Sequence, residues 1–354
     1  MKVLILADDL SGAADCAAPF AARGLRTVVT LGDPRGVDDS DVVAIDADTR
    51  RLPAEQAGEE VGRLVRAHAR GAGQLLYKKI DSTLRGHVGT EVAAALAELR
   101  RFTPDAQVVV APAFPKQGRV TRGKQQYANG IRVAASLPAL LAEAGLSHAH
   151  ICDAESEANL AAIAAFTPRS ALWVGSAGLA RHLDLGPSRP KGRDDRLKSF
   201  PQLSGPVLFV IGSTSFVSQQ QGDMLAREAG VQEICFDPTS MKITPLKISG
   251  DTLVRLPKKI NMHPDAARFA LAYFLAPHVH RAGALVLTGG DTARAVLQTI
   301  GVTGLRVWGE AEPGVAFSIA MGAWERPVIT KAGGFGDAST LVRCRAALKS
   351  SKLS

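Results

Sequence analysis

The chain has 354 residues, a net charge of +8 at pH 7 and a pI of about 9.5. Hydrophobic residues make up 46% of it, charged residues 21% and aromatic residues only 5%, and it has four scattered cysteines. This composition excludes fibrous, disulfide-stapled and membrane-spanning proteins, and it disfavours the aromatic platforms that bind single-stranded nucleic acid. At roughly 150 residues per domain, the length predicts about two domains.

The first half of the chain alternates short apolar runs with Ala- and Leu-rich stretches of helical periodicity. The first run, before two aspartates, is shorter than the roughly 7–15 apolar residues of a secretory signal, so we expect a strand and a cytoplasmic protein. The alternation predicts parallel sheets covered by helices on both faces. The expected strands are Val3–Leu6, Thr27–Thr30, Val42–Ile45, Gln74–Tyr77, Gln107–Val110 and Ala171–Val174. The expected helices are Ala13–Arg23, Ala54–Arg70, Thr90–Arg101 and Ala134–Ala144.

Residues 186–205 interrupt this rhythm, because they combine prolines with mixed charge and little apolar periodicity. The rhythm then restarts, whereas residues 237–263 have no clear pattern. The expected elements of this half are strands at Pro206–Ile211, Gln232–Phe236, Ala284–Leu287, Leu305–Trp308 and Pro327–Thr330, and a helix at Val217–Ala229. We therefore predict two α/β domains with largely parallel sheets and an interdomain cleft. The predicted boundaries are 1–187 for the first domain, 188–204 for the linker and 205–354 for the second domain.

The turns after the strands of the first domain gather carboxylates, hydroxyls and cations. Ligands of open α/β sheets bind beyond the carboxyl ends of the strands, where loops and helix amino termini converge. Carboxylates and hydroxyls suit a polyol and an arginine fork suits a carboxylate, although Asp and Ser here are also ordinary helix caps. The turns concerned are Asp8–Ala13, Lys78–Gly86, Ala113–Arg119 and Gly175–Gly178.

The corresponding turns of the second domain are smaller and richer in glycine. Glycine lets backbone N–H groups approach phosphate oxygens closely, and a following helix directs the positive end of its dipole at them. Three such turns in one domain predict a cradle for the phosphates of a nucleotide. They are Gly212–Ser215, Thr288–Thr292 and Lys331–Gly336.

Other phosphate, metal and nucleic-acid motifs are rejected. Gly118–Lys124 has the spacing of a P-loop, but Gln125 follows where Mg²⁺ binding needs Ser or Thr, and prolines separate it from the preceding strand. No strand is followed by G-x-G-x-x-G, and the His and Cys residues lack metal-ligand spacing, so we predict no metal site built by the protein. The +8 charge is concentrated in the linker and the tail. A modest positive field favours anionic substrates, and we expect neither nucleic acid nor a membrane as a partner.

The residues at these turns resemble the four-carbon acid sugar kinases, which phosphorylate tetronates and 3-oxotetronates. The similarity lies in ADDLSGAAD, KKIDSTLRGH, PAFPKQGRVTRG, GSAGLA, GSTS, GGDTA and KAGGFG, which occur in the family order from Leu6 to about Leu341. Ser11 replaces the more usual Thr, and the chain is shorter than expected for the family around residues 237–263. The resemblance implies a sugar-acid-binding amino-terminal domain and a nucleotide-binding carboxyl-terminal domain.

By this resemblance the protein is an ATP-dependent kinase of the terminal C4 hydroxyl of threonate, erythronate or a 3-oxotetronate, with ATP and Mg²⁺ as cofactors. The residues implied on the substrate side are Asp8, Asp9, Lys78, Asp81, Ser82, Arg85, Arg119, Ser176 and Gly178. The residues implied on the ATP side are Ser213, Ser215, Gly289, Gly290, Asp291, Thr292, Gly333 and Gly334.

Phosphoryl transfer needs positioning, charge neutralisation and an acceptor for the hydroxyl proton. We expect Arg85, with Arg119, to hold the substrate carboxylate. Asp9 or Asp81 would accept the proton, and the sequence leaves this choice open.

The choice between Lys78 and Lys79 for stabilising the transferring phosphoryl group is likewise open. Two other functions are also left open. A sugar-acid dehydratase or isomerase would use the same rim without ATP, but the metal-ligand or Schiff-base spacing that it needs is missing. A non-enzymatic two-domain sugar-acid sensor would bind its ligand without forming an ATP-dependent product. The sequence does not decide the oligomeric state, and a homodimer is one open alternative.

Overall fold

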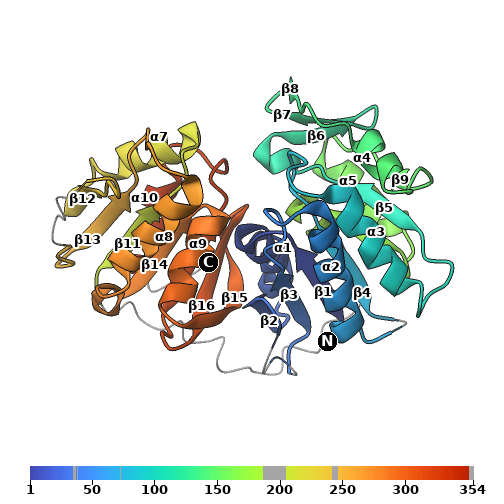
Figure 1. Ribbon diagram of the computed structural model, residues 1–354, viewed down its shortest axis with the longest axis horizontal. Helices are drawn as coiled ribbons and strands as arrows, with labels where there is room; N and C mark the ends of the chain where they lie inside the picture. The colour runs from blue at the N-terminus through green and yellow to red at the C-terminus, as the bar shows by residue number, and fades with distance from the viewer. Residues whose placement is uncertain (35–36, 38, 72, 186–204, 241–245, 351–354) are drawn as a thin grey trace. The chain divides into compact units, whose positions relative to one another are not determined.

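The computed structural model describes residues 1–34, 37, 39–71, 73–185, 205–240 and 246–350. The chain divides into two compact units, Met1–Ser188 and Arg189–Ser354, and each is described by itself (Figure 1). The linker predicted at 188–204 lies outside the described residues.

The first unit contains every strand and helix expected for its half of the chain, with shifted ends. Helix α1 begins three residues before the expected start, because the side chain of Asp9 accepts a hydrogen bond from the backbone N–H of Gly12 and caps it. The elements are β1 (Val3–Ala7), α1 (Leu10–Ala22), β2 (Thr27–Leu31), β3 (Val42–Asp46), α2 (Ala54–His68), β4 (Leu75–Lys79), α3 (Val88–Leu99), β5 (Val108–Ala111), the 3₁₀ helix η1 (Pro115–Gln117), β6 (Arg119–Arg122), β7 (Gln125–Ala128), β8 (Ile131–Arg132), α4 (Leu137–Glu143), β9 (His150–Ile151), α5 (Glu157–Phe166), β10 (Leu172–Gly175) and α6 (Ala177–Ala180).

The main sheet of this unit is parallel, in the order β2-β3-β1-β4-β10-β5-β9. From β1 the chain moves first to one side, through β2 and β3, and then to the other side, to β4. The strand order therefore reverses between β1 and β4, the position at which open α/β sheets bind ligands. Strands β6, β7 and β8, which the sequence analysis missed, form a separate antiparallel sheet.

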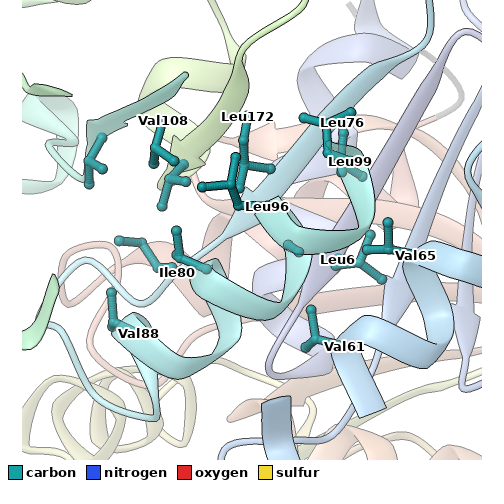
Figure 2. Close-up of a cluster of buried hydrophobic side chains, with 14 of the residues drawn as sticks. Leu6, Val61, Val65, Leu76, Ile80, Val88, Leu96, Leu99, Val108 and Leu172 are labelled. Carbon is teal, nitrogen blue, oxygen red and sulfur yellow. The ribbon is translucent and has the colours of Figure 1, made fainter. Parts of the chain in front are cut away.

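Alternation along the strands divides the core of this unit into two faces. Leu6 and Leu76 belong to the cluster packed under α2 and α3, where Val65 and Leu96 meet them (Figure 2). The residues of the opposite strand parity face the other side of the sheet, which α1 covers.

The same alternation separates the two lysines that end β4. Lys78 shares the parity of Leu76, so its ammonium enters the α3 face and pairs with Glu91 at 2.6 Å, with both side chains at most 2% exposed. It also donates to the backbone oxygen of Lys79 at 2.9 Å. This burial corrects the place expected for Lys78, which joins the sheet to α3 instead of facing the ligand rim.

The second unit contains β11 (Val207–Ile211), α7 (Phe216–Leu225), β12 (Val231–Cys235), β13 (Asp251–Arg255), α8 (Pro264–Leu275), the 3₁₀ helix η3 (Val279–Arg281), β14 (Ala284–Thr288), α9 (Gly290–Thr299), β15 (Val302–Glu312), β16 (Val315–Gly322), β17 (Pro327–Lys331) and α10 (Thr340–Lys349). Its strand order is β12-β13-β11-β14-β17-β16-β15, parallel from β12 to β17. Here the order reverses between β11 and β14.

Several parts of the second unit were not predicted from the sequence, including helices α8, α9 and α10. Strand β13 lies inside the segment 237–263 that had no clear pattern, and β15 and β16 form a long antiparallel hairpin where only Leu305–Trp308 was expected. The hairpin turns at Gly314, whose φ of 82° a side chain would disfavour. The sheet is therefore largely, and not wholly, parallel.

The Lys78–Glu91 pair should be a principal stabiliser of the first unit. Lys78→Met leaves a buried carboxylate without its cation and is expected to lower the free energy of unfolding by about 3–5 kcal/mol. The double variant Lys78→Met/Glu91→Leu removes both charges and should recover most of the loss. Urea denaturation followed by circular dichroism measures both effects, and an unchanged midpoint for Lys78→Met would contradict this assignment.

Candidate functional site

The switch point of the first unit gathers charged side chains from three strand ends. Asp8 and Asp9 follow β1, Arg50 follows β3, and Lys79 and Asp81 end or follow β4. All but Arg50 are at most 7% exposed. Burying carboxylates is costly unless cations and hydrogen bonds compensate them, so the contacts of these groups determine what the site can do.

Arg50 holds the two aspartates that follow β1. Its guanidinium donates to both oxygens of Asp8, at 2.7 and 3.0 Å, and to Oδ2 of Asp9 at 3.1 Å. The two carboxylates and Asp81, whose Oδ1 lies 3.7 Å from Arg50 Nη2, together hold the pKa of Arg50 well above its usual value in spite of its burial. The sequence analysis missed Arg50, although applying the strand-end rule to β3 would have found it.

Asp9 is fully engaged. Its Oδ1 accepts from the N–H of Gly12 at 2.9 Å, and its Oδ2 accepts from Ser11 Oγ at 2.9 Å and from Arg50. The hydroxyl of Ser11, which the family has more often as Thr, thus serves to orient this carboxylate.

Asp81 accepts different donors on its two oxygens. Oδ2 accepts from the N–H and the hydroxyl of Thr83 and from Arg85 Nε at 2.9 Å, and Oδ1 accepts from Arg85 Nη2 at 2.6 Å. Burial raises the pKa of this carboxyl, but the hydrogen bonds and charge of Arg85, with the charges of Arg50 and Lys79, hold the pKa well below its usual range. Arg85 itself is 64% exposed at its side chain, in contrast to Asp81 at 10%.

Arg119, at the start of β6, has donor capacity to spare. Its Nη1 donates to the backbone oxygen of Gln117 at 2.9 Å and to Asn129 Oδ1 at 3.0 Å, while Nε is buried with no hydrogen-bond partner among the described residues. Burial lowers the pKa of Arg119, and the charge of Asp81 opposes this lowering. A buried donor without an acceptor fits an anionic ligand.

Lys79 lies at the amino terminus of α1. A Cβ added to Gly12 would lie 2.8 Å from Lys79 Nζ and 2.6 Å from Asp9 Oδ1, so the glycine makes room for both groups. The ammonium, on the opposite face from Lys78, therefore lies with the carboxylates of the rim.

The remaining residues predicted on the substrate side have structural contacts. Ser176 caps α6 by accepting from Gly178 N–H at 3.1 Å, and its hydroxyl donates to the backbone oxygen of Ala113 at 2.8 Å. A Cβ on Gly178 would lie 2.3 Å from that same oxygen. Ser82 is buried, and its backbone oxygen accepts from the side-chain amide of Gln126, which anchors β7. These contacts shape the rim.

The switch point of the second unit is built from close backbone approach instead of charge. A Cβ on Gly333, after β17, would lie 2.2 Å from Ser213 Oγ, and one on Gly212, after β11, would lie 2.1 Å from Thr292 Oγ1. Gly289 caps α9 with a φ of 96° and donates its N–H to the backbone oxygen of Lys331 at 2.9 Å. The three glycine turns predicted from the sequence therefore converge.

Hydroxyls and amides hold this convergence in place. Ser215 caps α7, and its Oγ donates to the backbone oxygen of Gly333 at 2.7 Å, as does Ser218 Oγ. The side-chain amide of Gln219 donates to the backbone oxygen of Ser213 at 3.0 Å. Two helix amino termini, those of α7 and α9, flank the turns, an arrangement that suits phosphate groups.

Comparison with known proteins assigns the two units. A family model described as a sugar-binding N-terminal domain matches residues 3–150, and one described as a nucleotide-binding C-terminal domain matches residues 251–341. The chain is 37% identical to a D-threonate kinase of Cupriavidus necator, with 96% of each chain covered, and 30% identical to a D-threonate kinase of Bordetella bronchiseptica, with 98% of this chain and 97% of that one covered. The chain belongs to the four-carbon acid sugar kinase family.

More distant members and the fold agree with this assignment. A D-erythronate kinase of Heliobacterium modesticaldum is 25% identical, with 97% of this chain and 96% of that one covered. A solved structure from Salmonella typhimurium LT2 shares the fold, with a TM-score of 0.75 at 20% identity and 97% and 98% of the two chains covered. The members of this kinase family named here are phosphotransferases acting on an alcohol group.

Two charged side chains that the sequence analysis did not select also lie near the glycine turns of this kinase. Arg268 of α8 lies 3.8 Å from Asp291 and 2.9 Å from Asp265. Lys331 is 1% exposed and donates to the backbone oxygen of Ala332 at 2.9 Å, and burial lowers its pKa to about 8. A basic residue followed by glycines was a visible signal for Lys331, whereas only tertiary packing brings α8 to Asp291.

The described ranges contain no cluster of three or more His, Cys, Asp or Glu side chains arranged for a metal ion. Nor does any helix of those ranges combine the length and the apolar character needed to cross a bilayer. The glycine turns, with the amino termini of α7 and α9 beside them, suit the phosphates of a nucleotide.

Gly333→Ala should weaken nucleotide binding. The added methyl must displace Ser213 and break the convergence of the turns, so we expect the Kd for ATP, measured by calorimetry, to rise by about ten-fold or more, equivalent to about 1.4 kcal/mol. Gly250→Ala is the matched control, because the nearest atom to its Cβ lies 3.8 Å away. Equal affinities of the two variants would show that the turns do not hold the nucleotide.

Proposed function

We propose that the protein is an ATP-dependent kinase that phosphorylates the C4 hydroxyl of a four-carbon sugar acid, with D-threonate as the preferred acid. The observation that carries this proposal is the pairing of a buried Asp–Arg rim at one switch point with a glycine cradle at the other. Two relatives that are at least 30% identical over nearly the whole chain are named D-threonate kinases, which supports D-threonate over erythronate and 3-oxotetronate. Neither a dehydratase or isomerase nor a sensor finds support among these relatives.

The carboxylate of the acid is assigned to Arg119 and Arg85. Arg119 has a buried donor without an acceptor, and Arg85 is exposed enough to reach a ligand. Arg50 is committed to Asp8 and Asp9, and so it offsets their negative charge and fixes the orientation in which they would meet the hydroxyls of the acid. The positive charge of Arg50 thereby offsets the repulsion among Asp8, Asp9 and Asp81, the three carboxylates that would surround a polyol.

Asp81 is assigned as the acceptor of the hydroxyl proton. Asp9 is a helix cap with both oxygens engaged by fixed neighbours, whereas Oδ1 of Asp81 is covered chiefly by the exposed Arg85. Lys79, at the same rim, supplies positive charge where the phosphoryl group would arrive.

The nucleotide is ATP, with its phosphates against Ser213, Ser215, Gly289, Gly290, Thr292, Gly333 and Gly334. Mg²⁺ would be held chiefly by these phosphates and water, with Asp291 as the acidic side chain at that rim, and would neutralise charge on the transferring group. The predicted interdomain cleft, a cytoplasmic location and a homodimer stay predictions.

A coupled ADP-release assay tests the reaction. With D-threonate, D-erythronate, L-threonate and their 3-oxo forms, we expect the highest kcat/KM for D-threonate, since it is the acid in the names of two relatives that match nearly the whole chain at 30% identity or more. Absence of turnover with every acid, for protein whose circular dichroism shows it folded, would refute the kinase assignment.

Separate Asn variants of the two aspartates identify the proton acceptor. Asp81→Asn should reduce kcat by roughly 10²–10⁴-fold, the range for loss of a general base. Asp9→Asn should have a much smaller effect, because Asn is a good helix cap and can still accept from Gly12. Steady-state kinetics under saturating ATP measure both, and a larger loss in Asp9→Asn would transfer the role to Asp9.

A further inference from the structure

The proton acceptor assigned above is blocked in the free protein. Arg85 forms a two-pronged ion pair with Asp81, and its Nη2 covers Oδ1 at 2.6 Å. An arginine in this position competes directly with a substrate hydroxyl for the same lone pairs. With Arg85 in place, Asp81 is a weak base, in accordance with the strong lowering of its pKa.

The two members of this pair differ in how firmly they are held. Thr83 donates to Oδ2 of Asp81 from both its N–H and its hydroxyl, so the carboxylate keeps its orientation without Arg85. Arg85 has a 64% exposed side chain, and Asp81 is the only carboxylate within ion-pair distance of it in the described parts of the chain. The pair can therefore open by movement of Arg85 alone.

We propose that the carboxylate of the substrate itself removes Arg85 from Oδ1 of Asp81, so that the base is uncovered only when an acid is bound. This inference rests on the proposed kinase function. The carboxylate and the C4 hydroxyl lie at opposite ends of the acid, so Arg85 cannot hold the first while it still covers the oxygen at which the second must arrive.

The groups that surround Asp81 make this exchange favourable. After Arg85 leaves, Arg50 at 3.7 Å and the charge of Lys79 still compensate the Asp81 carboxylate. Strand β7, which pairs with the strand that begins at Arg119, is anchored to the loop after Asp81 by the hydrogen bond from Gln126 to the backbone oxygen of Ser82. In the reaction, the C4 oxygen then forms its bond to the γ-phosphorus, the bond to the ADP oxygen breaks, and the hydroxyl proton passes to Oδ1.

A polyol without a carboxylate is therefore disfavoured in two ways. It binds more weakly, and it leaves the base, Asp81, covered by Arg85. D-Threitol presents the same terminal hydroxyl without a carboxylate, so it leaves Arg85 on Asp81. Formate is a carboxylate small enough to bind Arg85 and Arg119 beside threitol. It should therefore draw Arg85 away from Asp81 as the carboxylate of the acid does.

The experiment measures ADP release with D-threonate, D-threitol, and D-threitol with added formate. For the wild type we expect threitol turnover to be stimulated about ten-fold or more by formate. In Arg85→Met the cover is gone, so threitol kcat/KM without formate should exceed that of the wild type, formate should no longer stimulate, and threonate KM should rise. Asp81→Asn should remove nearly all turnover of D-threonate, of D-threitol, and of D-threitol with formate.

Arg66→Met is the matched control, because Arg66 is a 60% exposed arginine on a carboxylate, Glu98, that is 11% exposed, on helices away from the rim. It should behave as the wild type with all substrates. Arg85→Lys keeps a cation that can pair with Asp81, so it should retain low threitol turnover and formate stimulation even if Arg85→Met does not fold.

Threitol turnover in Arg85→Met at or below the wild-type level, or an absence of formate stimulation in both the wild type and Arg85→Lys, would overturn the proposal. An absence of threonate turnover in the wild type would instead refute the kinase function on which it rests.

Discussion

Charge compensation between arginines and aspartates at the β1/β4 switch point is the constraint on which the site depends. Asp8, Asp9 and Asp81 are nearly inaccessible, and the cost of burying three carboxylates so close together is offset because Arg50 and Arg85 donate to them. In the function proposed above, these paired carboxylates meet the hydroxyls of the acid, and the remaining positive groups of the site meet its charge.

The switch point of the second unit has the same sheet geometry, but its ligand differs in charge from a sugar acid. A nucleotide brings several negative charges of its own, so its cradle needs backbone N–H groups and space more than it needs acidic side chains. Gly212 and Gly333 let the turns pack closely together, since a methyl at either position would collide with Thr292 or Ser213, and Gly289 allows a backbone φ of 96°. The two proposed ligand sites thus differ: the first is a compensated ionic rim, and the second combines glycine turns and helix amino termini with the charged groups Asp291, Arg268 and Lys331.

Two buried lysines, Lys78 and Lys331, contribute to the packing of the fold. Lys78 pairs with Glu91 between β4 and α3, and its backbone contact with Lys79 ties that packing to the rim. Lys331 is buried beneath the glycine turn that follows it, and its backbone oxygen joins that turn to Gly289. Each lysine is followed in the chain by a residue on the ligand side of its sheet. A change in core packing at the end of β4 or β17 would therefore also change the shape of the site.

The sequence by itself determined the α/β class, six of the seven strands in the main sheet of the first unit, the turns that carry chemistry and the family, because these follow from local periodicity and from short motifs. Tertiary structure decided what each charged side chain does. The parity of β4 sends Lys78 into the core and leaves Lys79 at the rim, and packing after β3 brings Arg50 to Asp8. Strand β13 and the β15–β16 hairpin also depend on partners distant in the chain. Charge pairing joins residues about 40 positions apart, as in Arg50 with Asp8, and no local pattern specifies such a pair.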